Sequence, residues 1–138
     1  MNGDAERKRI LIVDDDPSHL EIYGMIVDRA GYQPVPVLVR FAGPGPVPDG
    51  EIAAILLDYR LNSVKTAPEI AQEIKTKHPQ APILVLSDLW TMPTDIQPYA
   101  SEFVRKGEPE NLLNALHKLA APARAAIPAE KTSKTGES

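Results

Sequence analysis

The amino-acid sequence predicts an α/β fold, a parallel β-sheet with helices on both faces, and three observations lead to this prediction. Short apolar segments rich in branched side chains recur along the chain and have the length of buried strands. Segments with apolar residues at helical spacing lie between them. The two kinds alternate over about 120 residues, as in the strand–helix–strand units of a parallel sheet. A chain of 138 residues is long enough for one such domain with its own core.

The expected strands cover residues 10–13, 35–39, 52–57, 83–86 and 103–104. The third of them is apolar throughout, as expected for a buried strand. Pro34 and Pro36 place the second strand near an edge of the sheet, or put these residues at the strand start, because proline has no N–H for a ladder hydrogen bond.

Three helices are expected, over residues 17–30, 68–78 and 109–120. The first begins with Pro17 directly after Asp16, a residue type that accepts hydrogen bonds from the free N–H groups of a first helical turn. Gly31 stands where a cap at the end of this helix belongs.

The domain is expected to span residues 8–120. Residues 41–50 contain three prolines and three glycines, which exclude a regular helix in that segment. We expect residues 1–7 to form a flexible N-terminus. Residues 121–138 lack apolar periodicity, and we expect them to form a disordered tail.

Composition excludes several classes of protein. The net charge is −4 and the basic residues are scattered, which argues against nucleic acid as a partner. No apolar run approaches the roughly 20 residues of a membrane span, and the charged N-terminus is not a signal peptide, so no membrane partner is expected. The chain has no cysteine, so it has no disulfide and no thiolate metal site, and we expect a cytoplasmic location.

Three consecutive aspartates, Asp14, Asp15 and Asp16, close the first apolar segment. Adjacent carboxylates repel, and each raises its neighbour's pKa unless a cation offsets the repulsion. Mg²⁺ is a hard cation that often takes only one or two carboxylates and keeps several waters. A purely structural interpretation also exists, because Asp16 suits the N-cap of the following helix; it accounts for one aspartate, or for two at most.

Polar residues stand at the ends of four expected strands, namely Asp14 and Asp15, Asp58, Ser87 and Lys106. In open parallel sheets ligands bind beyond the carboxyl ends of the strands, so these groups should converge on one crevice. There Asp15 and Asp58 can hold Mg²⁺ directly and Asp14 through water, and the metal shields the Asp58 carboxylate for attack on a phosphoryl group. Lys106 and Ser87 would supply a cationic and a hydroxyl donor to the phosphoryl oxygens.

Four motifs make the chain resemble the response-regulator receiver domain of two-component signalling. They are Ile-Leu-Ile-Val-Asp-Asp-Asp-Pro at 10–17, Ile-Leu-Leu-Asp-Tyr-Arg-Leu at 55–61, Ile-Leu-Val-Leu-Ser at 83–87 and Phe-Val-Arg-Lys-Gly at 103–107. The resemblance covers roughly residues 8–120, and the first two motifs are quite specific at this separation. It implies a flavodoxin-like, doubly wound sheet of five parallel strands in the order 2-1-3-4-5, with helices on both faces.

The resemblance also implies roles for individual residues. Asp58 is the implied phosphoacceptor and works with Lys106. The implied Mg²⁺ ligands are Asp14, Asp15, Asp58 and the backbone carbonyl of Arg60.

Ser87 is the implied catalytic and switch hydroxyl, and Phe103 is the implied aromatic switch residue. The phosphodonor would be a histidine on a histidine kinase or a histidine phosphotransfer protein. The expected output of this stand-alone receiver is contact with a downstream protein of unknown identity. No separate catalytic activity is expected beyond Mg²⁺-dependent self-phosphorylation and autodephosphorylation at Asp58.

Several departures from the receiver pattern leave these chemical residues in place. They are a Pro/Gly loop at 42–50 in place of the second helix, an unusual loop at 61–66, Asp88 after Ser87, a short proline-bearing segment at 89–100 in place of the fourth helix, and Gly107 after the lysine. They weaken the expected switch rather than the site, so we expect phosphorylation with an unusual or absent dimer response.

Two other functions compete with this interpretation. The first is a pseudo-receiver, a protein-interaction module that keeps the fold and is not phosphorylated; Asp88 and the altered helices favour it. The second is a magnesium-dependent phosphatase with an Asp nucleophile on the first strand. Asp14 and Asp16 have the spacing of such enzymes, but Pro17 and Ser18 do not fit their turn.

Two further predictions concern the Arg60 side chain and the three histidines. Arg60 lies two residues past the acceptor, and we expect its side chain to cover the phosphoryl group and slow its hydrolysis. His19, His78 and His117 lie on different expected helices at no ligand-like spacing, and are interpreted as surface or helix-end residues.

Overall fold

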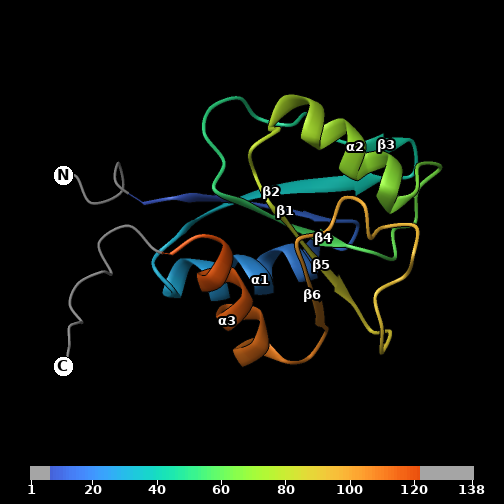
Figure 1. Cartoon of the computed structure of the whole chain (residues 1–138). Coiled ribbons are helices and arrows are strands. Elements are labelled where there is room, and N and C mark those ends of the chain that lie inside the picture. Colours follow the sequence, from blue (N-terminus) through green and yellow to red (C-terminus); the bar gives the residue numbers. More distant parts are fainter. Residues whose placement is uncertain (1–6, 122–138) are drawn as a thin grey trace, which may run out of the picture.

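The computed structural model describes residues 7–121, so almost all of the predicted flexible N-terminus and disordered tail lie outside the described residues. The elements in chain order are β1 (Arg9–Asp14), α1 (Pro17–Arg29), β2 (Gln33–Arg40), β3 (Gly43–Pro44), β4 (Ala54–Asp58), α2 (Ala67–Lys77), β5 (Ile83–Ser87), β6 (Glu102–Arg105) and α3 (Pro109–Leu119) (Figure 1).

The strands form one sheet in the order β3-β2-β1-β4-β5-β6. Without the short β3, the sheet has five parallel strands in the order β2-β1-β4-β5-β6. Numbered along the chain without β3, this is the predicted order 2-1-3-4-5. The predicted count of five strands is one too low. Gly43–Pro44 pairs antiparallel with the end of β2 and adds a two-residue strand at that edge.

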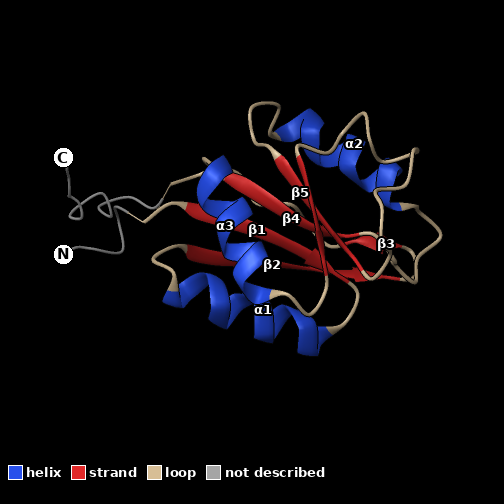
Figure 2. Cartoon of the chain, turned by 60° about the horizontal axis from the view of Figure 1, so that its bottom comes forward, coloured by secondary structure: helices blue, strands red, loops and turns tan. Residues whose placement is uncertain are grey.

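Helices cover both faces of the sheet, which confirms the predicted class. Helix α2 lies on one face, and α1 and α3 lie on the other (Figures 1 and 2). Successive strand residues point to opposite faces, so each buried strand supplies two apolar cores. The core under α2 contains Leu11, Val13, Ile55, Leu57, Ile70 and Ile74. The core under α1 and α3 contains Ile10, Ile12, Leu56, Val27, Leu112 and Leu116.

The two prolines of β2 are tolerated because their nitrogens, which carry no hydrogen, face away from β1. The Gln33 N–H donates to the Lys8 carbonyl on the β1 side, at 2.8 Å. Strand geometry alternates, so the nitrogens of Pro34 and Pro36 face the opposite side, where β2 pairs with β3 only at Val39 and Arg40.

Two connections lack a regular helix within the described part of the chain. The segment between β2 and β4 contains only β3 and loop, in agreement with its proline and glycine content. The segment between β5 and β6 consists of bends and turns around Ile96, a fully buried side chain. Among residues 7–121 no helix has the length and apolar character needed to cross a bilayer.

The helix starts follow local chemistry. Asp16 has extended backbone and accepts a hydrogen bond from the Ser18 N–H at 2.8 Å, which makes it the N-cap of α1 with Pro17 in the first turn. Helix α2 begins one residue earlier than predicted because Thr66 caps it together with Glu69.

Candidate functional site

Four strands bring the predicted polar groups to one edge of the sheet. Asp14, Asp58 and Ser87 are the last residues of β1, β4 and β5, and Lys106 directly follows β6. Their side chains are almost fully enclosed, since 1% of Asp14, 2% of Asp58 and none of Ser87 is exposed. Buried polar groups at the carboxyl ends of parallel strands are the usual setting of a ligand site in this class of fold.

Lys106 is the cation of the site. Its Nζ lies 2.7 Å from Asp58 Oδ1, and its side chain is 22% exposed. The Lys106 backbone N–H donates to the Ser87 carbonyl at 2.8 Å, which fixes the residue beside the end of β5. The sequence placed Asp58 and Lys106 at one crevice, and the structure brings them into direct contact.

Asp14 lies in a pocket that disfavours its charge. Burial, and then the nearby charge of Asp58, raise the pKa of Asp14 to about 6, although the backbone N–H of Asp16 and the charge of His19 act in the other direction. The Asp16 N–H donates to Asp14 Oδ1 at 3.0 Å, so the start of α1 holds the carboxylate in place.

The pKa of Asp58 is also raised, mainly by burial, while its hydrogen bond to Lys106 and the charge of that lysine lower it in part. Burial disfavours the charged form of Lys106 as well, but the hydrogen bond and charge of Asp58, with Asp14 adding to them, raise the Lys106 pKa overall. The site therefore concentrates negative charge, and a single ammonium group compensates it only in part.

Asp15 is less buried than Asp14 and Asp58. Its Oδ2 accepts a hydrogen bond from the Asn62 N–H at 2.9 Å, so it links the end of β1 to the loop after β4. In that loop the Arg60 N–H lies 3.4 Å from Asp58 Oδ1, which places the Arg60 backbone beside the Asp58 carboxylate. The metal roles of Asp15 and of the Arg60 carbonyl stay predictions.

The Arg60 side chain has a partner that the sequence did not indicate. Its Nε lies 3.3 Å from Asp88 Oδ1, and the two side chains are 62% and 61% exposed. Two residues that sequence analysis treated separately thus form one ion pair at the surface. An exposed pair of this kind is weak and easily exchanged for another partner.

The two predicted switch residues lie on neighbouring strands. Ser87 Oγ accepts a hydrogen bond from the Leu89 N–H at 3.1 Å. Phe103 is half-buried, lies opposite Val85 in the sheet and packs against the core under α2. Their movement in a switch stays a prediction.

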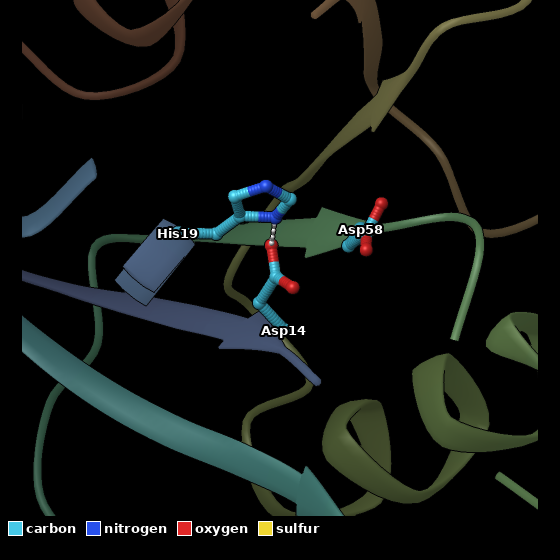
Figure 3. A group of neighbouring side chains, drawn as sticks. All are labelled: Asp14, His19 and Asp58. Atoms are coloured by element: carbon cyan, nitrogen blue, oxygen red, sulfur yellow. Dashed lines mark ion pairs between the residues drawn. The ribbon is translucent and has the colours of Figure 1, made fainter. Parts of the chain in front are cut away.

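His19 is the residue of this site that sequence analysis missed. Its Nδ1 lies 3.3 Å from Asp14 Oδ2, and Figure 3 shows the ring beside Asp14, with Asp58 opposite. His19 does lie at a helix end, as predicted, but its contact with Asp14 was not predicted from the sequence. A signal was available, because His19 is in the first turn of α1, where side chains point back toward the helix start and hence toward the end of β1.

The donor set fits a divalent cation. Asp14, His19 and Asp58 each offer one ligand atom, and these atoms lie within 4.8 Å of one another. Two buried carboxylates with raised pKa values gain most from a nearby cation, since it removes their mutual repulsion. Carboxylate oxygens are also the ligands that Mg²⁺ prefers in proteins.

No protein-family model matches the sequence, and no curated protein does. Solved structures do match. The chemotaxis protein CheY4 of Vibrio cholerae has a TM-score of 0.65 at 21% identity, over 82% of this chain and 98% of that chain. The receiver domain of a sensor histidine kinase from Pseudomonas aeruginosa, with magnesium coordinated in its active-site cleft, has a TM-score of 0.64 at 19% identity, over 82% and 97%.

A third match is the response regulator TrrA of Thermotoga maritima in complex with Mg²⁺ and BeF, with a TM-score of 0.63 at 23% identity, over 81% of this chain and 98% of that chain. The same protein in complex with the histidine kinase ThkA matches at a TM-score of 0.65 and 24% identity. At these identities the likeness is one of fold. It extends over nearly the whole of the matched chains and over about four fifths of this chain. The chain therefore has the fold of the response-regulator receiver domains.

Proposed function

We propose that this chain is a phosphorylatable receiver, in which Asp58 accepts a phosphoryl group from a histidine kinase or a histidine phosphotransfer protein. The observation that carries the proposal is the buried Asp58 carboxylate, 2.7 Å from Lys106 and close to Asp14 at the carboxyl end of the sheet. The fold supports a partner of this class, because one similar receiver is known in complex with a histidine kinase.

In the proposed reaction a carboxylate oxygen of Asp58 attacks the phosphorus of a phosphohistidine. The P–N bond to the imidazole breaks, an O–P bond to Asp58 forms, and the leaving imidazole takes up a proton. Lys106 already contacts Asp58 Oδ1, so its ammonium is in place to balance the charge of the transferred oxygens. Neither Lys106 nor the Arg60 N–H contacts Oδ2 in the described geometry, and this is the oxygen we assign to the attack.

Mg²⁺ is the metal of the proposed reaction, with Asp14, Asp15, Asp58 and the Arg60 carbonyl as its ligands. When bound, it neutralises charge between the acceptor and the incoming phosphoryl oxygens. Asp14 and Asp58 are close enough to share an ion, and Asp15 is held near them by the loop after β4. Magnesium in the cleft of a receiver with the same fold supports this assignment.

The proposed output is a change in contacts with a downstream protein. The Ser87 hydroxyl would bind a phosphoryl oxygen, and Phe103 on the next strand would follow the movement. Support comes from the position of Ser87, since its carbonyl holds the Lys106 backbone and its hydroxyl oxygen holds the Leu89 N–H. A shift of Ser87 would therefore act on both segments.

A second candidate is a pseudo-receiver that binds its partner without phosphorylation. Asp88 favours it, because this carboxylate adds negative charge next to the switch hydroxyl, and its exposed ion pair with Arg60 is too weak to cancel that charge. The absence of a helix in the described segments before β4 and before β6 favours it as well, because the receiver pattern has a helix in each of these places.

Intact-mass measurement after incubation with acetyl phosphate and Mg²⁺ distinguishes the two functions. The receiver function predicts a gain of one phosphoryl group that is lost in Asp58→Asn and in the presence of EDTA. Asp95→Asn is the matched control, because Asp95 is an exposed carboxylate that does not belong to the cluster of Asp14, His19 and Asp58, and it should keep the gain. A wild-type chain that binds Mg²⁺ and gains no mass would support the pseudo-receiver.

A further inference from the structure

The Nδ1 atom of His19 is buried, and it has no hydrogen-bond partner among the residues that the structure describes. The ring as a whole is 38% exposed, so solvent reaches its other side. Tyr23, one turn later in α1, packs edge-on against the ring at 6.1 Å between centroids and limits its orientation. Buried nitrogens are rarely left without a hydrogen-bond partner, so the position of this atom requires an explanation, and ligation of an ion provides one.

The distance from His19 Nδ1 to Asp14 Oδ2 is 3.3 Å, and the two atoms form no hydrogen bond of good geometry. In a tetrahedral site with metal–ligand bonds of about 2.0–2.1 Å, two ligand atoms are about 3.3–3.4 Å apart. The separation of these atoms thus equals one edge of such a site.

Asp58 supplies the third corner. Its ligand atom lies within 4.8 Å of the other two, so all three atoms lie within about 2.8 Å of a common point. If side-chain rotation moves each atom by less than about 1 Å, a metal at that point has bonds of the usual length. Lys106 contacts Oδ1 of Asp58, which leaves Oδ2 for a metal as long as Asp58 is not phosphorylated.

We propose that Asp14, His19 and Asp58 form a binding site for a divalent transition metal of the Zn²⁺ and Co²⁺ class, in competition with Mg²⁺. The inference rests on the acidic pocket of the proposed function and adds a nitrogen ligand to it. Three protein ligands leave the fourth position of a tetrahedron open, as in catalytic zinc sites, and a water or a phosphoryl oxygen would take it.

The nitrogen ligand is what separates the two classes of metal. Imidazole suits zinc and its transition-metal neighbours, whereas Mg²⁺ prefers oxygen ligands in an octahedral arrangement. Loss of His19 should therefore weaken binding of the transition metal and leave binding of Mg²⁺ to the carboxylates almost unchanged.

Metal titration of the full-length, untagged protein with Co²⁺, Zn²⁺ and Mg²⁺ tests the proposal. We expect wild type to bind one Co²⁺ with the intense visible absorption of a four-coordinate ion, and Zn²⁺ to displace it. His19→Gln should lose this absorption and bind Co²⁺ and Zn²⁺ at least about tenfold more weakly, with Mg²⁺ affinity within about twofold of wild type. His117→Gln, an exposed histidine on α3, is the matched control and should match wild type.

The outcomes separate this inference from the proposed function. If His19→Gln keeps the Co²⁺ spectrum and affinity while both proteins bind Mg²⁺, the nitrogen ligand is refuted and the receiver function stands. If wild type binds Mg²⁺ but gives only the weak absorption of octahedral Co²⁺, the inference is again refuted. If no divalent metal binds, the inference and the Mg²⁺ part of the proposed function both fail. Circular dichroism of each variant, with His19→Asn as a second substitution, excludes loss of folding as the cause.

Discussion

The contact between Asp58 and Lys106 is the interaction on which the proposed chemistry depends. A buried carboxylate is costly unless a cation or hydrogen-bond donors compensate it. Asp58 is 2% exposed and has Lys106 at 2.7 Å, so the pair satisfies this requirement. In the proposed reaction the same contact would prepare Asp58, because the ammonium already lies beside the carboxylate that would carry the phosphoryl group.

Replacing the cation should therefore destabilise the fold. Lys106→Met leaves Asp58 buried without its cation, raises the Asp58 pKa further, and should lower the free energy of unfolding by about 2 kcal/mol at pH 7. The loss should diminish as the pH falls, because protonation of Asp58 removes the uncompensated charge. Urea denaturation at a series of pH values from 7 downward measures this change.

Lys118→Met is the matched control for this experiment. Lys118 Nζ lies 3.2 Å from Glu102 Oε2, but the lysine side chain is 68% exposed. Such surface pairs contribute little, so the change should stay within about 0.5 kcal/mol. Equal losses in the two variants would show that burial of the Asp58–Lys106 pair is not what makes it important.

Asp14 gives the fold a pH dependence of defined sign. The pKa of Asp14 is about 6 in the folded protein, whereas the ordinary value of 3.8 applies to the unfolded chain. Between these pH values the folded state therefore binds more protons than the unfolded state. This difference makes the free energy of unfolding fall as pH rises from about 4 to 6. Without divalent metal, Asp14→Asn should therefore be more stable than wild type at pH 7, by on the order of 2 kcal/mol.

The advantage of Asp14→Asn should disappear below about pH 4, where wild-type Asp14 is protonated as well. Denaturation in EDTA at a series of pH values between 4 and 7.5 measures it. Asp95→Asn, at an exposed carboxylate, should not show this gain. A variant that is less stable than wild type at pH 7 would mean that the Asp14 charge is compensated in the folded state.

Arg60 is expected to leave Asp88 and cover the phosphoryl group once Asp58 is phosphorylated, because a dianionic group attracts it more strongly than one exposed carboxylate. Arg60→Ala should therefore shorten the lifetime of the phosphoryl form by about threefold to tenfold. Loss of the mass gain over time, after removal of the phosphodonor, measures this lifetime. Arg40→Ala, at an exposed arginine on β2, should leave it unchanged, and an unaltered lifetime in Arg60→Ala would refute the role.

At the scale of elements, the ends of helices and strands position the site. The parallel strands of the site end at the same edge of the sheet, so their last side chains lie there. The start of α1 places two more groups at this edge, the Asp16 N–H and the His19 ring. Helix α2 follows the loop that carries Arg60 and Asn62, so the cap of α2 fixes where this loop ends.

That cap should contribute measurably to stability. The Thr66 side chain accepts a hydrogen bond from the Glu69 N–H at 3.3 Å, and Glu69 Oε1 accepts one from the Thr66 N–H at 2.9 Å. Thr66→Ala should lower the free energy of unfolding by about 1 kcal/mol. Thr76→Ala, an exposed position within α2, should be neutral or slightly stabilising because alanine is the better helix former. Urea denaturation of both variants checks the difference.

At the scale of the whole molecule, two apolar cores on opposite faces of one sheet stabilise the strands whose ends form the site. The core under α1 and α3 also includes Tyr32, a fully buried side chain whose hydroxyl donates to the Ala120 carbonyl. This bond joins the turn after α1 to the end of α3, which are 88 residues apart in the chain.

Removal of this hydroxyl should be felt by the whole domain. Tyr32→Phe leaves the buried Ala120 carbonyl without this donor and should lower the free energy of unfolding by about 1–2 kcal/mol. Thermal and urea unfolding measure the loss. Tyr59→Phe is the control, because the Tyr59 hydroxyl donates to Asp95 at an exposed position and its removal should cost less than about 0.5 kcal/mol.

The sequence by itself determined the parallel α/β fold and the convergence of Asp14, Asp58, Ser87 and Lys106, whereas the order of its main strands was implied by the resemblance to receiver domains. The fold class and the convergence follow from short-range information. Apolar periodicity defines the elements, and the residue after each buried strand must lie at the carboxyl edge of a parallel sheet. The prolines of β2 were interpretable for the same reason, since a missing N–H restricts a residue wherever it occurs.

Only the tertiary structure decided which side chains meet there. The approach of His19 to Asp14, the ion pair of Arg60 with Asp88 and the antiparallel addition of Gly43–Pro44 depend on how α1 and two loops lie across the sheet. Side-chain identity fixes what a group can bind, whereas the packing of distant segments fixes its partners. Exposed and loop residues have several partners of similar energy, so the sequence pattern alone does not choose among them.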